Sequence, residues 1–320
     1  MAAKDLITLA RAEQSMQDYT PGSNDSVVSA LITAASDAIE KFCCRHFYSR
    51  SFDELYNGTG DRRLLLRQYP VQSVQSVRYR PVTVLKITNT DLTNVQARVA
   101  VLSTGLQLVS VKSGVKTTAT AGLTFASNPT LSALAAAVSA AGNGWSAQYV
   151  GDTTNYGSWP SADLYVPASY GDTLEGSGVL QSQGALQGVA GSFAELKMHT
   201  YELQGYQWDA RGWLLRAIPY TDPELLHPED LVFPVGINNF RVQYTAGYST
   251  IPEAVQEACA RWVAYAYWAC QRDPALLHQV PSSGTTSGWT EAASDVMSPP
   301  RDVLVLLAPY RRHAVGTNQS

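Results

Sequence analysis

The chain has 320 residues, which is enough for two or three domains that each have a hydrophobic core. Hydrophobic residues make up 45% of the sequence, which excludes wholesale disorder, and a net charge of −4 argues against a protein whose main affinity is for a phosphate backbone. Charged residues are only 16%, which suits a subunit that buries much of its surface against neighbours, although β-rich extracellular modules have similar compositions.

The N-terminal region has helical patterns. Thr8 can cap a short helix from Leu9 to about Met16, and a second helix is predicted from Val27 to about Cys44. The apolar stripe predicted for this second helix is Val28, Leu31, Ala35, Ala38 and Phe42, with Ile32 and Ile39 beside it. Many of its residues are small, so another helix can approach closely, and the long helix near the C-terminus is the expected partner.

A β region follows the second helix. The segments 52–56 and 64–66 flank Asn57-Gly58-Thr59-Gly60, and Asn and Gly at such a position predict a β-hairpin. We expect a turn at Pro70 and a strand from about Val74.

The composition changes between Val82 and Lys197, where charges become sparse and Ser, Thr, Ala and Gly dominate. Two alternating segments predict strands, one on Val95, Ala97, Val99 and Val101 and the other on Trp145, Ala147 and Tyr149. Between them, a helix is predicted from the spacing of Leu131, Leu134, Ala135 and Val138. The region reads as a self-contained α+β insert, with a loop-rich second half over 151–191.

A strand that turns directly into a long helix occupies 239–273. Phe240, Val242 and Tyr244 alternate with polar residues, and Thr250 to Glu253 reads as a capping box. The buried stripe predicted for the helix is Val255, Ala258, Cys259, Trp262, Val263, Ala266 and Cys270. Tyr265 and Trp268 lie off this stripe. They are therefore candidates for contacts between subunits, and contact with the β region of the same chain is an equally favoured interpretation.

The C-terminal region is polar, with a flexible linker predicted over 281–288 and a short helix around Val303 to Leu307. The patterns together predict an α+β protein with three parts. A small helical-bundle core with β-hairpins is formed by 1–81 and 198–275, a β-rich α+β domain is inserted over 82–197, and an extended, flexible tail with a short helix covers 276–320.

The patterns that carry catalytic chemistry do not stand out in the sequence. There is no phosphate-binding loop or dinucleotide fingerprint, and the histidines His46, His199, His227, His278 and His313 share no local context. The cysteines Cys43, Cys44, Cys259 and Cys270 have no metal-ligand spacing and are expected to be reduced core residues of a cytoplasmic protein. Cys43-Cys44-Arg45-His46 could mark a reactive thiol, but a helix end packed into the core is the preferred interpretation. We expect no enzyme, no cofactor, no metal and no membrane span.

Three ordered groups of segments resemble the head-to-tail adaptor (connector) proteins of long-tailed bacteriophages. They are 6–10 with 34–43 and 45–47, then 64–66 with 69–74, and finally 242–248 with 251–253 and 256–258. The resemblance covers about 5–81 and 200–310, and the compact members of that family lack the segment 82–197.

The resemblance implies a structural virion protein in the neck between capsid and tail, assembled in the bacterial cytoplasm. Such adaptors form a homo-oligomeric ring, typically of twelve subunits, between the portal protein and a stopper or tail-completion protein. Double-stranded DNA passes through the central channel without sequence-specific binding. In the family, the segment after the long helix tends to reach the portal. The portal-docking candidates are therefore Leu304, Leu306, Leu307, Tyr310, Arg311 and Arg312.

A basic cluster is formed by Arg62, Arg63, Arg67, Arg78 and Arg80. These side chains could face the lumen of a ring and touch phosphates, or they could pair with acidic residues of an adjacent subunit. We favour the second interpretation, because each neutralised phosphate adds affinity and would oppose the sliding of DNA.

Two other functions remain open. A carbohydrate-binding or tail-associated surface module could use the aromatic residues Tyr149, Tyr156, Trp159, Tyr165 and Tyr170, although packing of loops is the safer interpretation. A hydrolase could use a pair of carboxylates from Asp152, Asp163, Asp172 and Glu175, but nothing in the sequence fixes two of them at a catalytic separation.

Overall fold

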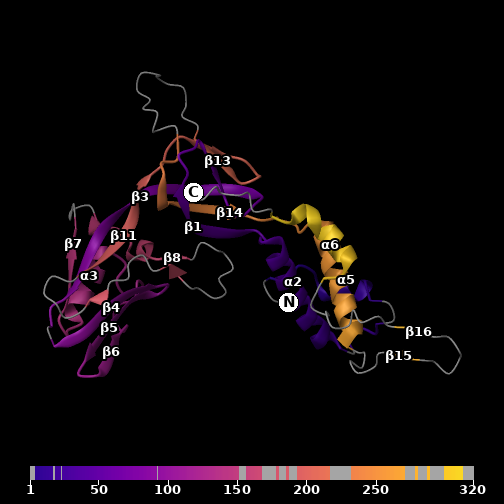
Figure 1. Ribbon diagram of the computed structural model, residues 1–320, viewed down its shortest axis with the longest axis horizontal. Coiled ribbons are helices and arrows are strands. Elements are labelled where there is room, and N and C mark those ends of the chain that lie inside the picture. The colour runs from indigo at the N-terminus through magenta and orange to yellow at the C-terminus, as the bar shows by residue number, and fades with distance from the viewer. Residues whose placement is uncertain are drawn as a thin grey trace, which may run out of the picture. The chain divides into compact units, whose positions relative to one another are not determined.

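The computed structural model describes residues 4–16, 19–22, 24–91, 93–150, 156–167, 178–179, 185–186, 193–216, 232–270, 278–279, 287–288 and 299–312. The chain divides into two compact units. The first contains Met1–Arg50, Arg67–Pro70 and Ala246–Ser320, and the second contains Ser51–Leu66 and Val71–Thr245. The predicted α+β class is confirmed, because helices dominate the first unit and strands dominate the second (Figure 1). Within the described ranges, no helix is both long and apolar enough to cross a membrane.

The first unit is helical. Its α-helices within the described ranges are α1 (Leu9–Gln14), α2 (Asp25–Cys43), α5 (Glu253–Cys270) and α6 (Arg301–Leu307), and the 3₁₀-helix η5 (Ala308–Tyr310) follows α6. Thr8 caps α1 as predicted, because its hydroxyl accepts a hydrogen bond from the amide of Arg11 at 3.2 Å. A short pair of strands, β15 (His278–Gln279) and β16 (Ser287–Gly288), also belongs to this unit, and the remainder of the predicted linker over 281–288 lies outside the described residues.

The helical core forms where α2 and α5 face each other. On α5 the predicted stripe is buried at Val255, Ala258, Cys259, Trp262 and Val263, whereas Ala266 is half-buried and the side chain of Cys270 lies outside the described residues. On α2 the buried face is Val28, Ile32, Ala35, Ser36, Ile39 and Cys43. This face is rotated from the predicted stripe, because the larger Ile32 and Ile39 occupy its centre while Leu31, Ala38 and Phe42 pack at its margin.

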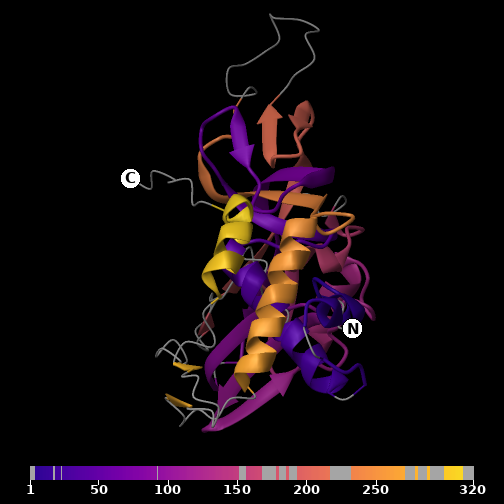
Figure 2. The ribbon, with the colours of Figure 1, turned by 90° about the vertical axis from the view of Figure 1, so that its right-hand side faces the viewer.

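Segment 299–312 is part of this core rather than an extended tail. Val303 and Leu307 of α6 are fully buried with residues of α2 and α5, and Figure 2 shows α6 running alongside α5. The amide of Arg312 also donates to the carbonyl of Cys43 at 2.9 Å. The predicted short helix is therefore present. Its apolar residues recur four apart on one face, and that face is covered by the subunit's own helices.

The second unit contains a sheet with the strand order β1–β14–β3–β11, in which β7 also pairs with β3. These strands are β1 (Arg50–Gly58), β3 (Val71–Asn89), β7 (Trp145–Tyr149), β11 (Phe193–Glu202) and β14 (Gly236–Ala246). Phe240, Val242 and Tyr244 are fully buried, which confirms the alternation predicted for β14. Arg241 is also buried, with 3% of its surface exposed, because β14 is an inner strand of the sheet.

The predicted hairpin across 52–66 is wrong. Strand β1 pairs with β14, whereas β2 (Arg63–Leu65) joins a separate sheet of order β12–β13–β2 with β12 (Tyr206–Trp208) and β13 (Trp213–Arg216). Gly58 is required for close approach instead of for a turn. A Cβ atom there would lie 1.7 Å from the carbonyl oxygen of Pro234.

The second unit also contains a hydrophobic core of its own over the predicted insert. A sheet of order β10–β4–β5–β6 faces α3 (Leu131–Ala140); its strands are β4 (Asn94–Leu102), β5 (Gly105–Lys112), β6 (Val115–Ala119) and β10 (Ala185–Leu186). The predicted helix is confirmed, because Leu131, Leu134, Ala135 and Val138 are all buried. In β4, however, Val95 is 67% exposed, because an irregularity between Asn94 and Gln96 shifts the register there.

The predicted domain boundary at 81/82 falls inside a continuous strand. Strand β3 is 19 residues long, and β11 pairs with it from Thr88 to Arg78. Residues on both sides of the boundary therefore belong to one ribbon, and the division into 82–197 and its flanks stays a prediction. The loop-rich character predicted for 151–191 falls largely outside the described residues. The described part includes the 3₁₀-helix η1 (Ser161–Leu164) and the pair β8 (Val166–Pro167) and β9 (Gly178–Val179).

Candidate interaction surfaces

The two subunit-contact candidates lie on α5, and both are half-buried. Trp268 packs against the helical core of its own chain and meets the ring of Tyr267 edge-on, with 5.1 Å between the ring centroids. Tyr267 in turn accepts a hydrogen bond from Asn24 at 3.1 Å. Trp268 is thus partly engaged within its own subunit, and the contact of Tyr265 and Trp268 with a neighbouring subunit stays a prediction.

The portal-docking candidates are distributed unevenly around α6 and η5. Leu307 is fully buried, Leu304 is half-buried, and Leu306 and Tyr310 pack at the edge of the helical core. The ring of Tyr310 lies 6.1 Å from that of Phe47. Leu307 therefore presents no surface to a partner while α6 is packed in this way.

The two arginines at the end of this segment also contact the same unit. The guanidinium of Arg311 lies over the ring of Phe42 at 5.1 Å, and the backbone of Arg312 binds Cys43. The exposed residues of α6 include Asp302 and Val305, of which Val305 is 68% exposed. The role of the six candidates in binding a portal stays a prediction.

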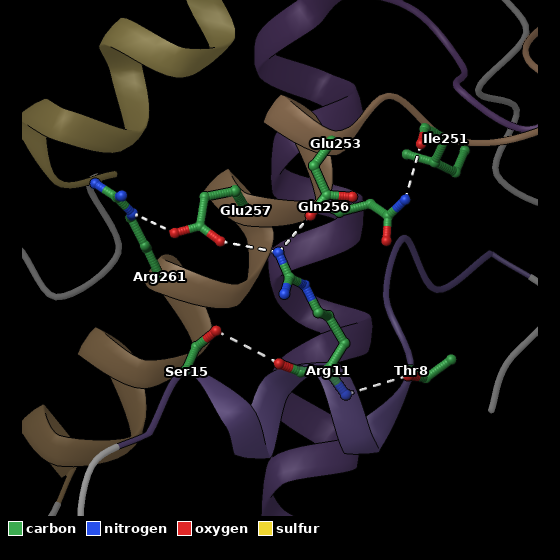
Figure 3. A network of polar contacts seen from close by, with 8 residues as sticks. All are labelled: Thr8, Arg11, Ser15, Ile251, Glu253, Gln256, Glu257 and Arg261. Atoms are coloured by element: carbon green, nitrogen blue, oxygen red, sulfur yellow. Dashed lines mark hydrogen bonds and ion pairs between the residues drawn. The ribbon is translucent and has the colours of Figure 1, made fainter.

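A row of charged side chains joins α1 to α5 (Figure 3). It continues to Asp302 on α6. The guanidinium of Arg11 lies 2.5 Å from the carboxylate of Glu253 and 3.1 Å from that of Glu257. Glu257 also pairs with Arg261 at 2.9 Å, and Arg261 reaches Asp302 at 3.3 Å. These solvent-screened pairs orient the helices more than they stabilise them.

The same contacts correct the predicted capping box at the start of α5. The carboxylate of Glu253 binds Arg11 rather than the amide of Thr250, and α5 begins at Glu253. Gln256 donates instead to the carbonyl of Ile251 at 2.8 Å, which satisfies a backbone group just before the helix.

The five arginines of the predicted basic cluster do not share one environment. Arg78 forms an ion pair with Asp163 at 2.9 Å, and Arg80 lies over the ring of Tyr201 at 5.6 Å. Arg62 and Arg63 are exposed, and Arg67 belongs to the helical unit. Arg78 therefore already has a carboxylate partner within its own chain. Contact of this cluster with a lumen or with an adjacent subunit stays a prediction.

An exposed apolar tip at the start of β14 was not predicted from the sequence. Ile237 is 84% exposed and Val235 is 79% exposed, which are the highest values among the large hydrophobic residues described. Their only signal in the sequence is an apolar pair flanking Gly236 after a proline-rich loop. Exposed apolar side chains of this kind mark candidate contact sites.

Hydrogen bonds hold the backbone of the tip in place. The side chain of Asn239 accepts from the amide of Gly58 at 2.7 Å and donates to the carbonyl of Pro234 at 2.8 Å. The side chain of Asn57 accepts from the amide of Asn238 at 2.8 Å, and a ring nitrogen of buried His199 lies 2.8 Å from the carbonyl of Asn238. The tip is thus ordered before any partner arrives, which lowers the entropy cost of binding.

Cys43 and Arg45 at the end of α2 pack into the core, as the preferred interpretation of Cys43-Cys44-Arg45-His46 required, but Cys44 is exposed and is not the core residue that was predicted. Burial raises the pKa of the Cys43 thiol to about 12, so this thiol is not activated. Arg45 is 3% exposed, and its guanidinium lies 3.8 Å from the ring centre of Tyr69 while donating to the backbone carbonyl of that residue. His46 pairs with Glu40 at 2.7 Å. These contacts organise the end of α2 within the helical unit.

The alternative functions gain no organised site in the described ranges. Tyr149, Tyr156, Trp159 and Tyr165 pack against the core of the second unit, and Tyr170 lies outside the described residues. Asp163 is paired with Arg78, and Asp152, Asp172 and Glu175 lie outside the described residues. Within the described ranges, no group of three or more His, Cys, Asp or Glu residues is placed to hold a metal ion.

Comparison with known proteins supports the resemblance drawn from the sequence. Residues 5–134 match the family model of the head completion proteins, HCP. The matched range contains α1 and α2 and extends past residue 81, so the head completion model also covers the first part of the predicted insert. No match was found among curated proteins.

Two solved structures are similar along the whole chain. One is a chain in the virion of a native gene transfer agent particle, at 13% identity and a TM-score of 0.34, and the other is a chain in the neck of an empty gene transfer agent particle, at 12% identity and a TM-score of 0.36. Each alignment covers 100% of this chain and 96% of the other. At these TM-scores the likeness supports no conclusion about the fold.

Proposed function

We propose that this protein is a structural head-to-tail adaptor that completes the head of a virion and sits in its neck. The observation that carries the proposal is the match of residues 5–134 to the head completion family. The mode of action is mechanical. One weak contact between subunits is repeated around a closed homo-oligomeric ring, and the many parallel contacts make attachment to the portal tight.

The partners in this proposal are a portal protein on one side and a stopper or tail-completion protein on the other. Twelve subunits form the ring, and double-stranded DNA passes through its channel without being read. The pairing of Arg78 with Asp163 and of Arg80 with Tyr201 supports the last point, because these cations already have partners within the chain. A channel lined by fewer free cations neutralises fewer phosphates and holds DNA less tightly.

The apolar tip of Val235 and Ile237 is the contact surface that fits this role best. It is uncharged, it is held by hydrogen bonds, and it exposes two β-branched side chains. Burial of two such side chains at an interface contributes about 1.5–3 kcal/mol each. Repeated around a closed ring, several such contacts reinforce one another.

The test is native mass spectrometry of the full chain, alone and with the portal protein of the same particle, with negative-stain imaging of the products. We expect closed rings or portal particles capped by this protein. A chain that stays monomeric at high concentration and never binds the portal would overturn the proposal. Binding of the full chain to a glycan array would instead favour the carbohydrate-binding alternative.

A further inference from the structure

An ion pair with a buried guanidinium joins two neighbouring strands of the sheet in the second unit. The guanidinium of Arg241 on β14 binds the carboxylate of Asp53 on β1 through two bonds, from Nε at 2.8 Å and from Nη2 at 2.7 Å. Gln243 donates to the same carboxylate at 3.0 Å. Arg241 is 3% exposed, so solvent screens this pair far less than the surface pairs of the helical unit.

The same guanidinium reaches η1, which follows α3 and β7 in the chain. Nη1 of Arg241 donates to the backbone carbonyl of Asp163 at 2.8 Å, and Nη2 lies 3.3 Å from the carbonyl of Tyr165. The side chain of Asp163 pairs with Arg78 on β3 at 2.9 Å. Three strands of the sheet, β1, β14 and β3, are therefore joined to η1 by one set of charged groups. We call Asp53, Arg78, Asp163 and Arg241 the polar clamp.

The other side of η1 is attached to the core beneath α3. Leu164 is fully buried in that core. The amide of Ser161 donates to the carbonyl of Pro129 at 3.0 Å, and the amide of Leu131, the first residue of α3, donates to the carbonyl of Trp159 at 2.9 Å. Segment 156–165 is thus fixed at one side to α3 and at the other to the sheet.

The α3 and β4–β6 region is also connected to the β1–β14–β3 sheet by the ribbon of β3 and β11. Strand β7 widens this ribbon only at residues 85–89 of β3, and narrow ribbons twist more than broad sheets do. An attachment at a separate point, through η1, removes that freedom to twist. Removing one partner of a pair that contains a buried charge leaves that charge uncompensated, so the intact attachment is favoured.

We propose that the polar clamp locks the α3 and β4–β6 region to the β1–β14–β3 sheet as one rigid body, so that this region is held at a fixed angle to the sheet. The inference does not depend on the adaptor function, because every contact in it lies within one chain.

The test measures a distance distribution by double electron–electron resonance. Spin labels are placed at V115C on β6 and V235C in the tip, two exposed positions outside the clamp, in a C44S and C270S background. The variant R241M keeps the length of the side chain but removes all four of its hydrogen bonds. R98M on β4 is the matched control, because Arg98 is exposed.

We expect a single narrow distribution in the parent and in R98M, and a distribution at least twofold wider in folded R241M. An equal width in folded R241M would overturn the proposal. A variant that fails to fold does not remove the test, because a broad or bimodal distribution in the parent protein would overturn the proposal by itself. Failure here leaves the adaptor function untouched, since ring formation is measured separately.

Discussion

Replacement of Leu307 by Ala is the sharpest test of the packed position of α6. Leu307 is fully buried between its own helix and the core of α2 and α5, so the substitution loses the whole transfer free energy of the side chain and leaves a cavity. For a buried Leu the expected loss is about 2–5 kcal/mol in the free energy of unfolding. Val305 on the same helix is 68% exposed, and V305A should change that free energy by less than about 0.5 kcal/mol.

The assay is urea unfolding of both variants and the parent, followed by far-UV circular dichroism, which reports on the helices. Equal unfolding midpoints for L307A and V305A would refute the packed position and favour a free tail. Truncation after Pro274 gives a second check. It removes both Val303 and Leu307 from the core, so we expect the helical unit to lose stability rather than to persist without its tail.

Further outcomes concern thiols, pH and the apolar tip. Iodoacetamide should modify exposed Cys44 at least tenfold faster than its neighbour Cys43, because burial raises the pKa of the Cys43 thiol to about 12. Tandem mass spectrometry of the peptide that contains both residues measures the ratio of the two rates. Burial lowers the pKa of His199 below its ordinary value of 6.5. The histidine is therefore protonated at a higher pH in the unfolded chain than in the folded protein, and the free energy of unfolding should fall as the pH drops through 6.5. Urea unfolding at two pH values should show a smaller fall for H199Q, and an equal fall in both proteins would contradict this account. I237D should reduce oligomers in native mass spectrometry while V115D, at an exposed valine on β6, should not; equal effects would show that the tip is no specific contact.

Local patterns predicted the elements whose contacts are local. The alternation of Phe240, Val242 and Tyr244 and the spacing from Leu131 to Val138 gave the correct strand and helix, because burial on one face is written directly into such periods. The apolar stripe predicted for α2 is rotated slightly about the helix axis from the face that is actually buried. Leu31 and Ile32 are both apolar, and only the partner helix decides which of them faces inward.

Contacts between distant segments could not be predicted in the same way. The partner of β1 is β14, about 180 residues further along the chain, so a local turn signal at Asn57-Gly58 suggested a hairpin that does not form. The packing of Val303 and Leu307 was missed because a polar stretch precedes them and suggests a free tail. The exposure of Ile237 was missed because the predicted strand began at Asn239, two residues after it.

The continuous strand β3 has a mechanical consequence for the second unit. At 19 residues and about 3.3 Å per residue it is roughly 60 Å long. A force along its axis loads its hydrogen bonds to β11 and β7 simultaneously, in shear, whereas a force across it would open them one after another. A tensile force along β3 would therefore be resisted by all of these hydrogen bonds together. The backbone of β3 would transmit the same force across residue 82, because the strand is continuous there.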